Sequence, residues 1–461
     1  MGNSSNELQR GLKERHIALI ALGSAIGVGL FLGSSSSIKL AGPGILLSYL
    51  FCGIILFFIL RALGEMAVHH PVAGSFSQYA HDYLGNLAGY ITGWNYWFVW
   101  VITCMTELTA VGIYMEFWFP EVPRWIWILA ALIIMMGFNF LQVSVYGELE
   151  FWFALIKIVA IIFMIIIGLG MIFFGFGNNG VPTGISNLWE HGGFFPNGLE
   201  GVLMSFQMVM FAFLGIEMIG VTAGEAKDPE KTLPKAINST LIRILIFYVG
   251  ALFVIMSIYP WNEIGTSGSP FVLTFDKIGI PAAAGIINFV VLTAALSSCN
   301  TGIFSSGRML YNLAQNGQAP KAFGKLNKKG VPFRGVMVTS AVLLIGVLLN
   351  YLVPAHVFTW IASISTFGAL LTWFIILLAQ WRFRKTITAK QQKNIKFKIP
   401  LYPISTYFAG AFLIFVVILL GYYPDTRIAL IVGPIWVAIL VIAYYAANLN
   451  KRQNEAEVKE T

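Results

Sequence analysis

Charged side chains are scarce in this sequence of 461 residues, in which Asp, Glu, Lys and Arg together make up 11%. Soluble domains typically carry about 25% charged residues. Hydrophobic residues make up 57% of the chain, and the mean hydropathy is +0.76. This balance excludes a soluble domain as the main body of the protein and predicts a chain that lies in a lipid bilayer.

Cysteine is also scarce. The three cysteines, Cys52, Cys104 and Cys299, lie in separate apolar runs, which argues against a disulfide framework and fits no metal-ligand spacing. The histidines lie at or outside the ends of the apolar runs, and none forms a metal-binding pair on a helix face. The sequence therefore predicts no metal and no cofactor. No cleavable signal peptide is expected either, because residues 1–16 are polar and the first apolar run is too long.

Long apolar runs account for most of the chain. At ~20 residues for each membrane-spanning helix, they predict about twelve spans with short connections. Most of the 29 basic residues share one side of the membrane if the chain begins in the cytoplasm, as the positive-inside rule requires. We therefore expect an all-α, multi-pass protein of the cell (inner, cytoplasmic) membrane with both termini cytoplasmic. The net charge of +8 reflects this topology and does not indicate nucleic-acid binding.

The first apolar run, residues 17–40, is unusually rich in glycine. Gly23, Gly27 and Gly29 fall close together, and each costs about 1 kcal/mol relative to Ala in a helix interior. Backbone groups freed inside a membrane are tolerated only where they are buried or line a cavity. The pattern therefore predicts a broken helix whose half-helix N-terminus directs bare N–H groups at a carboxylate.

The sixth run, residues 199–221, carries a second interruption around Gly215 and Glu217. Interrupted spans at matching positions of two halves indicate a transporter built from inverted repeats. The first and sixth spans match if each repeat has five spans, which would occupy residues 17–176 and 199–381. A basic cytoplasmic loop (382–403), two further helices (404–449) and short cytoplasmic tails (1–16 and 450–461) complete this organisation. The alternative is that each break is only a kink in a packing helix.

Lys157 lies about two turns into the fifth span, where an ionisable residue is costly and by default functional. In the functional interpretation, its ammonium group braces the broken first helix against the eighth span, near Ser297 and Ser298. The alternative is that the lysine extends along the helix to the cytoplasmic surface.

Two acidic residues are further candidates. Glu217 follows Gly215 closely and should face the same gap, where it either carries a proton, since burial favours the neutral carboxyl, or accepts hydrogen bonds from loosened backbone. Glu107 either faces the pocket or satisfies a neighbouring helix. Glu65, Glu148 and Glu150 are weaker candidates, because solvated caps and gate salt bridges look alike at the cytoplasmic ends of spans.

Several motifs together resemble a known family. They are Arg10-Gly11-Leu12 with Arg15-His16, the break at 23–31, and the segments 61–66, 211–217, 223–229 and 307–310. In this order and over nearly the whole chain, they are similar to the amino acid transporter family of the amino acid-polyamine-organocation superfamily. Within it, the chain looks most similar to bacterial proline-specific and threonine or serine permeases. The resemblance implies twelve transmembrane helices in a five-plus-five inverted repeat, with discontinuous helices 1 and 6 and two extra helices.

The resemblance also implies a substrate site. The substrate carboxylate would meet the backbone N–H groups of Gly27, Val28 and Gly29. The α-amino group would meet carbonyls near Ser24, Ala25, Phe211 and Leu214, and Phe211 would act as an aromatic gate. Lys157 matches a lysine that replaces a sodium ion in sodium-independent relatives, which favours protons as the coupling ion. Val28 stands where many members carry Thr or Ser, so a hydroxyl contact is missing. Selectivity would come from Thr103, Cys104, Glu107 and residues on later spans.

The predicted mechanism is proton-coupled uptake of a neutral amino acid, proline or threonine/serine, by alternating access. The substrate would bind as a zwitterion between the two breaks, spans 1, 2, 6 and 7 would rock against the other spans of the repeats, and a proton would bind at Glu217. The only partners expected are the amino acid and the bilayer, with a monomer as the transport unit. An amino acid exchanger on the same fold would share these residues. A membrane-embedded receptor or enzyme is the alternative from another class, and the absence of a nucleophile–base pair at depth argues against an enzyme.

Overall fold

A computed structural model describes residues 26–72, 75–141, 143–221, 229–264, 268–277 and 281–449, and these ranges contain helices, turns and loops but no strand. The helices are α2 (Val28–Phe31), α3 (Gly33–Ala41), α4 (Ile45–His69), α5 (Ser75–Leu84), α6 (Asn86–Glu116), α7 (Arg124–Asn139), α8 (Val143–Phe174), α9 (Gly198–Ala212), α10 (Met218–Val221), α11 (Pro229–Ile244), α12 (Ala251–Ile258), α13 (Pro270–Lys277), α14 (Pro281–Gln315), α15 (Phe333–Leu352), α16 (Val357–Thr386), α17 (Ala389–Lys393), α18 (Ile404–Leu420) and α19 (Ile428–Ala446). Short 3₁₀ segments and one π-helical segment, η4 (Leu245–Gly250), lie between them.

Eight helical stretches within the described ranges are long and apolar enough to cross a membrane. They are Gly33–His69, Asn86–Glu116, Val145–Phe174, Glu230–Ile258, Ala282–Gln315, Phe333–Leu352, Val357–Thr386 and Ile428–Ala446. Three shorter helices, α7, α9 and α18, are also apolar. The prediction of an all-helical, multi-pass membrane protein is confirmed at this level.

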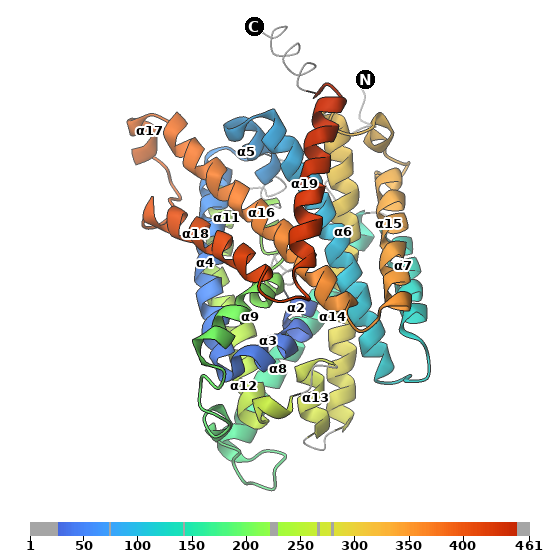
Figure 1. Ribbon diagram of the computed structural model, residues 1–461, viewed down its shortest axis with the longest axis vertical. Coiled ribbons are helices and arrows are strands. Elements are labelled where there is room, and N and C mark those ends of the chain that lie inside the picture. The colour runs from blue at the N-terminus through green and yellow to red at the C-terminus, as the bar shows by residue number, and fades with distance from the viewer. Residues whose placement is uncertain are drawn as a thin grey trace.

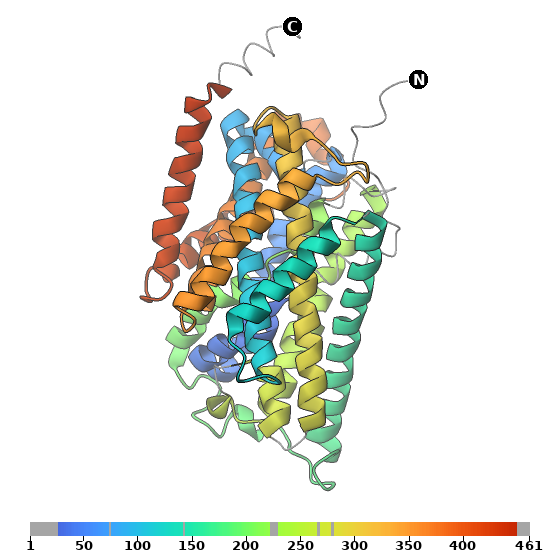
Figure 2. The ribbon, with the colours of Figure 1, turned by 90° about the vertical axis from the view of Figure 1, so that its right-hand side faces the viewer.

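The helices form one elongated bundle (Figures 1 and 2). The long helices α6 and α14 pack along each other, and α14 also contacts α8. Helix α3 packs along α9, while α4 contacts α11 and α16. Helices α5 and α17 lie at one end of the bundle and α13 lies at the other (Figure 1). We use α17 and α13 to name these two ends.

Small residues allow the central helices to approach closely, as is typical of membrane bundles. A Cβ atom built on Gly302 of α14 would lie 2.2 Å from the sulfur of Cys104 on α6. A Cβ on Gly29 of α2 would lie 2.3 Å from the Cα atom of Ala212, the last residue of α9. Helices α2 and α9 therefore meet backbone to backbone, close to the non-helical residues Ile26 and Gly27 and to the turns that follow Ala212.

Candidate functional site

The second predicted interruption is present, and of the first the described ranges contain the part from Ile26 onward. Ile26 and Gly27 are not helical, and α2 begins only at Val28. In the apolar run 199–221, α9 ends at Ala212 and α10 begins at Met218, with turns from 213 to 217 between them. Gly215 has a φ of +92°, a conformation that side chains with a Cβ rarely adopt. Residues 23–25, including the predicted contacts Ser24 and Ala25, lie outside the described residues.

A long side chain satisfies a carbonyl group at each break. Lys157 Nζ donates to the Ile26 carbonyl at 3.1 Å and to Ser297 Oγ at 3.2 Å. The Tyr248 hydroxyl, on the π-helical segment η4, donates to the Ala212 carbonyl at 3.2 Å. Lys157 is 0% exposed, so the alternative in which it extends to the surface is wrong. Its contact with Ser297 joins the first break to α14.

A small cavity lies where the two breaks meet. It is lined by Gly27, Gly29, Trp100, Thr103, Glu107, Phe211, Ala212, Leu214 and Ser298. Its volume is about 10 Å³, roughly the room that one water molecule needs. The walls must therefore separate before a molecule the size of an amino acid can enter.

Glu107 is the acidic side chain in this lining. A Cβ on Gly27 would lie 2.9 Å from Glu107 Oε1 and 3.5 Å from Ser298 Oγ, so both side chains face the first break. Glu107 is 3% exposed, and its Oε2 accepts no hydrogen bond within the described ranges. Between the two positions left open by the sequence, the structure places Glu107 at the cavity.

Other predicted site residues lie beside the cavity without lining it. Val28 is buried in α2. Cys104 is buried, and its sulfur lies 3.5 Å from the Cys299 carbonyl. Ser297 faces Lys157, one residue from the lining residue Ser298. Glu217 was expected to face the same gap as the first break, but it is not among the lining residues. Instead, Trp373 Nε1 of α16 donates to Glu217 Oε2 at 3.3 Å.

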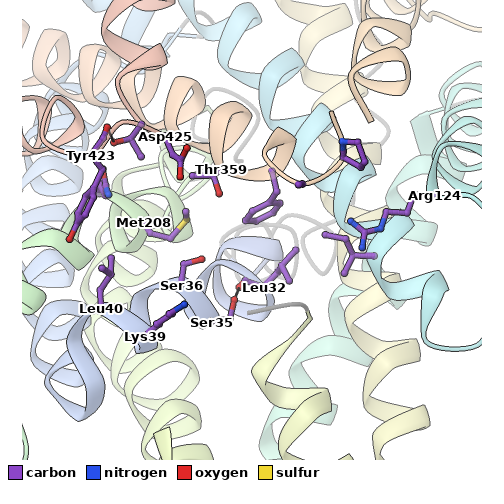
Figure 3. A pocket seen from close by; sticks show the side chains of 16 residues that line it. Leu32, Ser35, Ser36, Lys39, Leu40, Arg124, Met208, Thr359, Tyr423 and Asp425 are labelled. Carbon is purple, nitrogen blue, oxygen red and sulfur yellow. Dashed lines mark hydrogen bonds between the residues drawn. The ribbon is translucent and has the colours of Figure 1, made fainter. Parts of the chain in front are cut away.

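A second, larger pocket lies next to the cavity, with a volume of about 640 Å³. We call it the vestibule. Figure 3 shows Ser35, Ser36 and Lys39 of α3 on one of its walls and Thr359 and Asp425 on another. Its lining therefore contains hydroxyl groups and charged side chains of both signs.

Two aromatic rings separate the vestibule from the cavity. Phe358 lines the vestibule and Phe211 lines the cavity. Their ring centroids are 6.3 Å apart and their planes are perpendicular at 89°. Phe211, which the resemblance proposes as a gate, therefore stands at the boundary between the two spaces.

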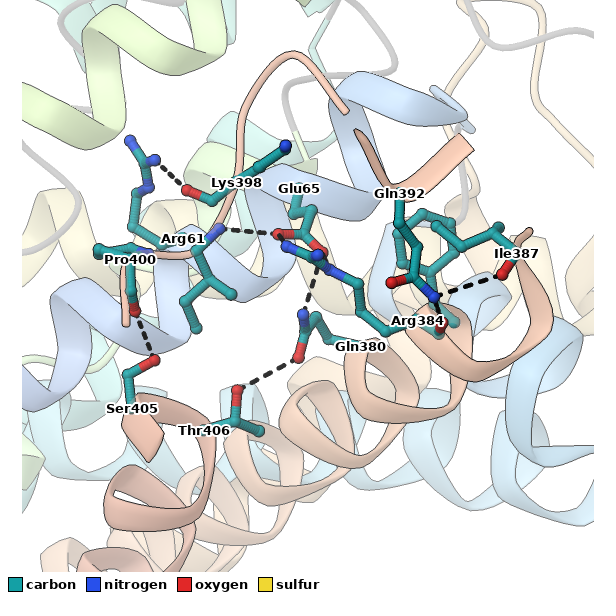
Figure 4. Close-up of polar contacts among 12 residues, drawn as sticks. Arg61, Glu65, Gln380, Arg384, Ile387, Gln392, Lys398, Pro400, Ser405 and Thr406 are labelled. Carbon is teal, nitrogen blue, oxygen red and sulfur yellow. Dashed lines mark hydrogen bonds and ion pairs between the residues drawn. The ribbon is translucent and has the colours of Figure 1, made fainter. Parts of the chain in front are cut away.

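A buried polar cluster joins α4 to α16 (Figure 4). Glu65 is 0% exposed and accepts hydrogen bonds from Arg384, from Gln380 Nε2 at 3.0 Å and from the Ile399 backbone N–H at 2.7 Å. Ile399 belongs to the segment 394–400, which we call the strap and which lies between α17 and α18. Glu65 is thus not a solvated cap, and Glu150, which is 1% exposed, is not one either.

Trp100, Ala212, Tyr248 and Arg384 were not singled out from the sequence. Trp100 stands one turn before Thr103 on α6, so helical periodicity from Thr103 and Glu107 was a usable signal for it. Nothing in the sequence indicated Tyr248 or Arg384. No group of His, Cys, Asp or Glu side chains with the arrangement of a metal site occurs among the residues that the structure describes.

A helical membrane protein in which non-helical backbone from two apolar segments meets at an internal cavity has the architecture of a small-molecule transporter. Comparison with known proteins agrees with this class: the amino acid permease family model matches residues 16–457. The chain belongs to the amino acid permease family.

Three relatives from Bacillus subtilis (strain 168) cover nearly the full length. The chain is 66% identical over 456 residues to the uncharacterized amino acid permease YtnA, covering 99% of this chain and 98% of the relative. It is 53% identical to the probable threonine/serine transporter YbxG, covering 97% of both chains. It is 51% identical to the amino-acid permease AapA, covering 96% and 97%. Relatives and family are transporters rather than enzymes.

Proposed function

We propose that this permease imports a small neutral amino acid, with threonine, serine or proline as the first candidates, by proton symport. The observation that carries the proposal is the backbone contact between Gly29 and Ala212, which brings two interrupted spans together around a cavity lined by Glu107 and Ser298. The N–H groups of Gly27, Val28 and Gly29 would bind the substrate carboxylate, and carbonyls near Phe211 and Leu214 would bind its amino group.

The fold proposed for this mechanism has twelve spans, with inverted repeats at 17–176 and 199–381 and two helices at 404–449. The α17 end, where the basic segment 382–403 lies, would face the cytoplasm, together with both termini. The vestibule would then open to the outside of the cell membrane. Uptake would require the bundle to close over the vestibule and open at the α17 end. The transport unit would be a monomer.

Proton coupling is supported by acidic side chains that border the breaks. Glu217 lies in the second break and is 3% exposed. In a low-dielectric site a carboxyl group gains a proton more readily than in water, and binding it would remove one buried charge as the substrate-loaded protein closes. Lys157 would supply a fixed positive charge at the first break.

Uptake of labelled proline, threonine, serine, histidine and phenylalanine should be measured in transport-deficient cells that express the protein. We expect accumulation of at least one small neutral amino acid, abolished when the proton gradient is collapsed. Counterflow without gradient-driven accumulation would identify an exchanger instead. The absence of both uptake and counterflow for all the amino acids tested, with the protein present in the membrane, would overturn the proposal.

A further inference from the structure

Glu150, which has no role in the mechanism above, is connected to the first break through two side chains. Ser297 Oγ donates to Glu150 Oε1 at 2.5 Å. Lys157 Nζ donates to the same Ser297 oxygen and to the Ile26 carbonyl. Lys157 follows Glu150 by seven residues on α8, so both lie on one face, and helical side chains lean toward the N-terminus. The Lys157 side chain therefore extends toward Glu150 while its ammonium group binds the Ile26 carbonyl at the first break.

The charges around this connection do not balance. Glu107 and Glu150 are 3% and 1% exposed, and both interact electrostatically with the one buried ammonium group of Lys157. Two carboxylates and one ammonium leave a net charge of −1, and an uncompensated buried charge costs of the order of several kcal/mol. One bound proton, on either carboxyl group, would remove the excess. Oε2 of Glu107 and Oε2 of Glu150 each accept no hydrogen bond within the described ranges, so either oxygen can take the proton.

Polar side chains lead from Glu150 toward the α17 end of the bundle, where α8 begins (Figure 2). The Tyr146 hydroxyl, one turn before Glu150, lies 3.2 Å from Thr301 Oγ1. Asn139 Nδ2 donates to Asn300 Oδ1 at 2.8 Å. Tyr146 and Asn139 line another cavity of about 10 Å³, which is roughly the room for one water.

The elements that pack most closely against α8 carry few other titratable groups within the described ranges. Helix α14 carries Cys299, Arg308 and Tyr311, η4 carries Tyr248, and α12 carries none. Arg308 lies over the ring of Phe304, which stacks on Tyr146. Lys157 is thus the cation whose interaction with Glu150 the geometry supports.

We propose that Glu150 is a proton-binding site open to the α17 end, and that its protonation state sets how firmly Ser297 and Lys157 hold the Ile26 carbonyl. A proton from water at that end would form an O–H bond with Glu150 Oε2 and would return to water on release. With Glu150 ionised, its charge attracts Lys157 and keeps the first break as observed. With Glu150 neutral, the attraction is lost and conformations with a closed vestibule gain population. The proposal rests on the proposed function only for assigning the α17 end to the cytoplasm.

A substrate-free measurement tests this site. The reporter is Ser36→Cys in the vestibule, because the three native cysteines are buried. Purified protein in liposomes is labelled from outside with a membrane-impermeant maleimide, so that only molecules with an outward vestibule react, while the internal pH is varied at constant external pH. We expect the labelling rate to fall severalfold as the internal pH falls from 8 to 6.

Adding Glu150→Gln should give a low labelling rate that no longer depends on internal pH. Glu148→Gln is the matched control, because Glu148 lies two residues before Glu150 on α8 and is less buried. This variant should keep the dependence on internal pH. A flat profile in the reporter protein itself, or an unchanged profile after Glu150→Gln, would overturn the proposal. If Glu150→Gln does not fold, Ser297→Ala carries the test, because it removes the bridge and should flatten the profile. No amino acid is present, so failure of the proposed transport function would leave this result unaffected.

Discussion

Arg384 and Glu65 form a two-point ion pair between the last turn of α16 and α4. Arg384 Nε lies 2.5 Å from Glu65 Oε1, and Nη2 lies 2.7 Å from Oε2. The side chains are 9% and 0% exposed. The Ile399 backbone N–H also binds Glu65, so the same carboxylate holds the strap. The pair therefore fastens three segments together at the α17 end, while the vestibule provides space on the far side of the breaks.

The first prediction concerns the stability of this fastening. Glu65→Ala leaves the buried Arg384 guanidinium without its partner, and breaking a buried pair typically costs about 3–5 kcal/mol. We expect a clear fall in Tm in detergent for each single variant. The double variant Glu65→Ala/Arg384→Ala should lose less than the sum of the two, as a double-mutant cycle would measure.

The control is an ion pair on the same strap that is exposed. Lys396 Nζ lies 2.5 Å from Glu230 Oε2, but the side chains are 69% and 50% exposed. Exposed pairs contribute ~0–1 kcal/mol, so Lys396→Ala should leave Tm nearly unchanged. Equal losses for Lys396→Ala and Glu65→Ala would contradict the assignment of Glu65 as the anchor.

The second prediction concerns the direction in which the vestibule opens. Thr359→Cys places a thiol in the vestibule, and Lys390→Cys places one on an exposed residue of α17. A membrane-impermeant thiol reagent added to intact cells should label Thr359→Cys and spare Lys390→Cys. In inside-out vesicles Lys390→Cys should react. The reverse pattern would place the α17 end outside the cell and reject the proposed topology.

The sequence allowed the turns at 213–217 and the non-helical backbone at Gly27 to be predicted, because their cause is local. Glycines at Gly27, Gly29 and Gly215 weaken a helix wherever they stand, and a buried Lys157 needs an oxygen partner nearby. The expectation that the two breaks face each other came from their matching positions in the two predicted repeats. The contact of Lys157 with Ser297 was predicted as well and is confirmed, since a lysine inside an apolar span requires polar partners.

Long-range partners could not be predicted in this way. Glu65 and Arg384 are 319 residues apart, and nothing near Glu65 distinguishes a buried ion pair from a solvated cap. Glu217 was misplaced because its orientation depends on the turns after Ala212, which put the carboxyl group next to Trp373. The volume of the central cavity depends on the conformation of the whole bundle, and no local pattern specifies it.

The third prediction concerns proton coupling at Glu217. Glu217→Gln removes the ionisable group but keeps an oxygen that can accept the hydrogen bond from Trp373 Nε1. Substrate counterflow should therefore persist, while accumulation driven by an imposed proton gradient in vesicles should be lost. Accumulation that remains pH-driven would remove Glu217 from the coupling role and leave it as a partner of the loosened backbone.

The fourth prediction concerns the aromatic boundary between vestibule and cavity. Phe211→Ala removes one of the two rings, so a bound amino acid should escape toward the vestibule more readily. We expect faster efflux of preloaded substrate and a lower accumulation ratio. Phe206→Ala is the matched control on the same helix: its ring is also buried but packs against Phe51 and Phe412, away from the cavity. Equal efflux from both variants would reject Phe211 as a gate.

The last prediction concerns the contact between the two breaks. Gly29→Ala adds a Cβ that would lie 2.3 Å from the backbone Cα of Ala212. Backbone atoms cannot turn aside as a side chain can, so the two spans must separate, and overpacking of this kind costs about 1–3 kcal/mol or more. We expect a lower Tm together with the loss of transport per folded molecule, because the backbone groups proposed to bind the substrate would move apart.

Gly137→Ala in α7 is the control, because no atom lies within 4 Å of the added Cβ and Ala is favoured over Gly in a helix by about 1 kcal/mol. Its Tm should be unchanged or higher, with normal transport. Gly27→Ala is a third variant for comparison, because its added Cβ would meet the movable carboxyl group of Glu107 instead of backbone atoms. If Gly29→Ala transported normally, the carboxylate site could not depend on the close approach of the two spans, and the mechanism would need another substrate path.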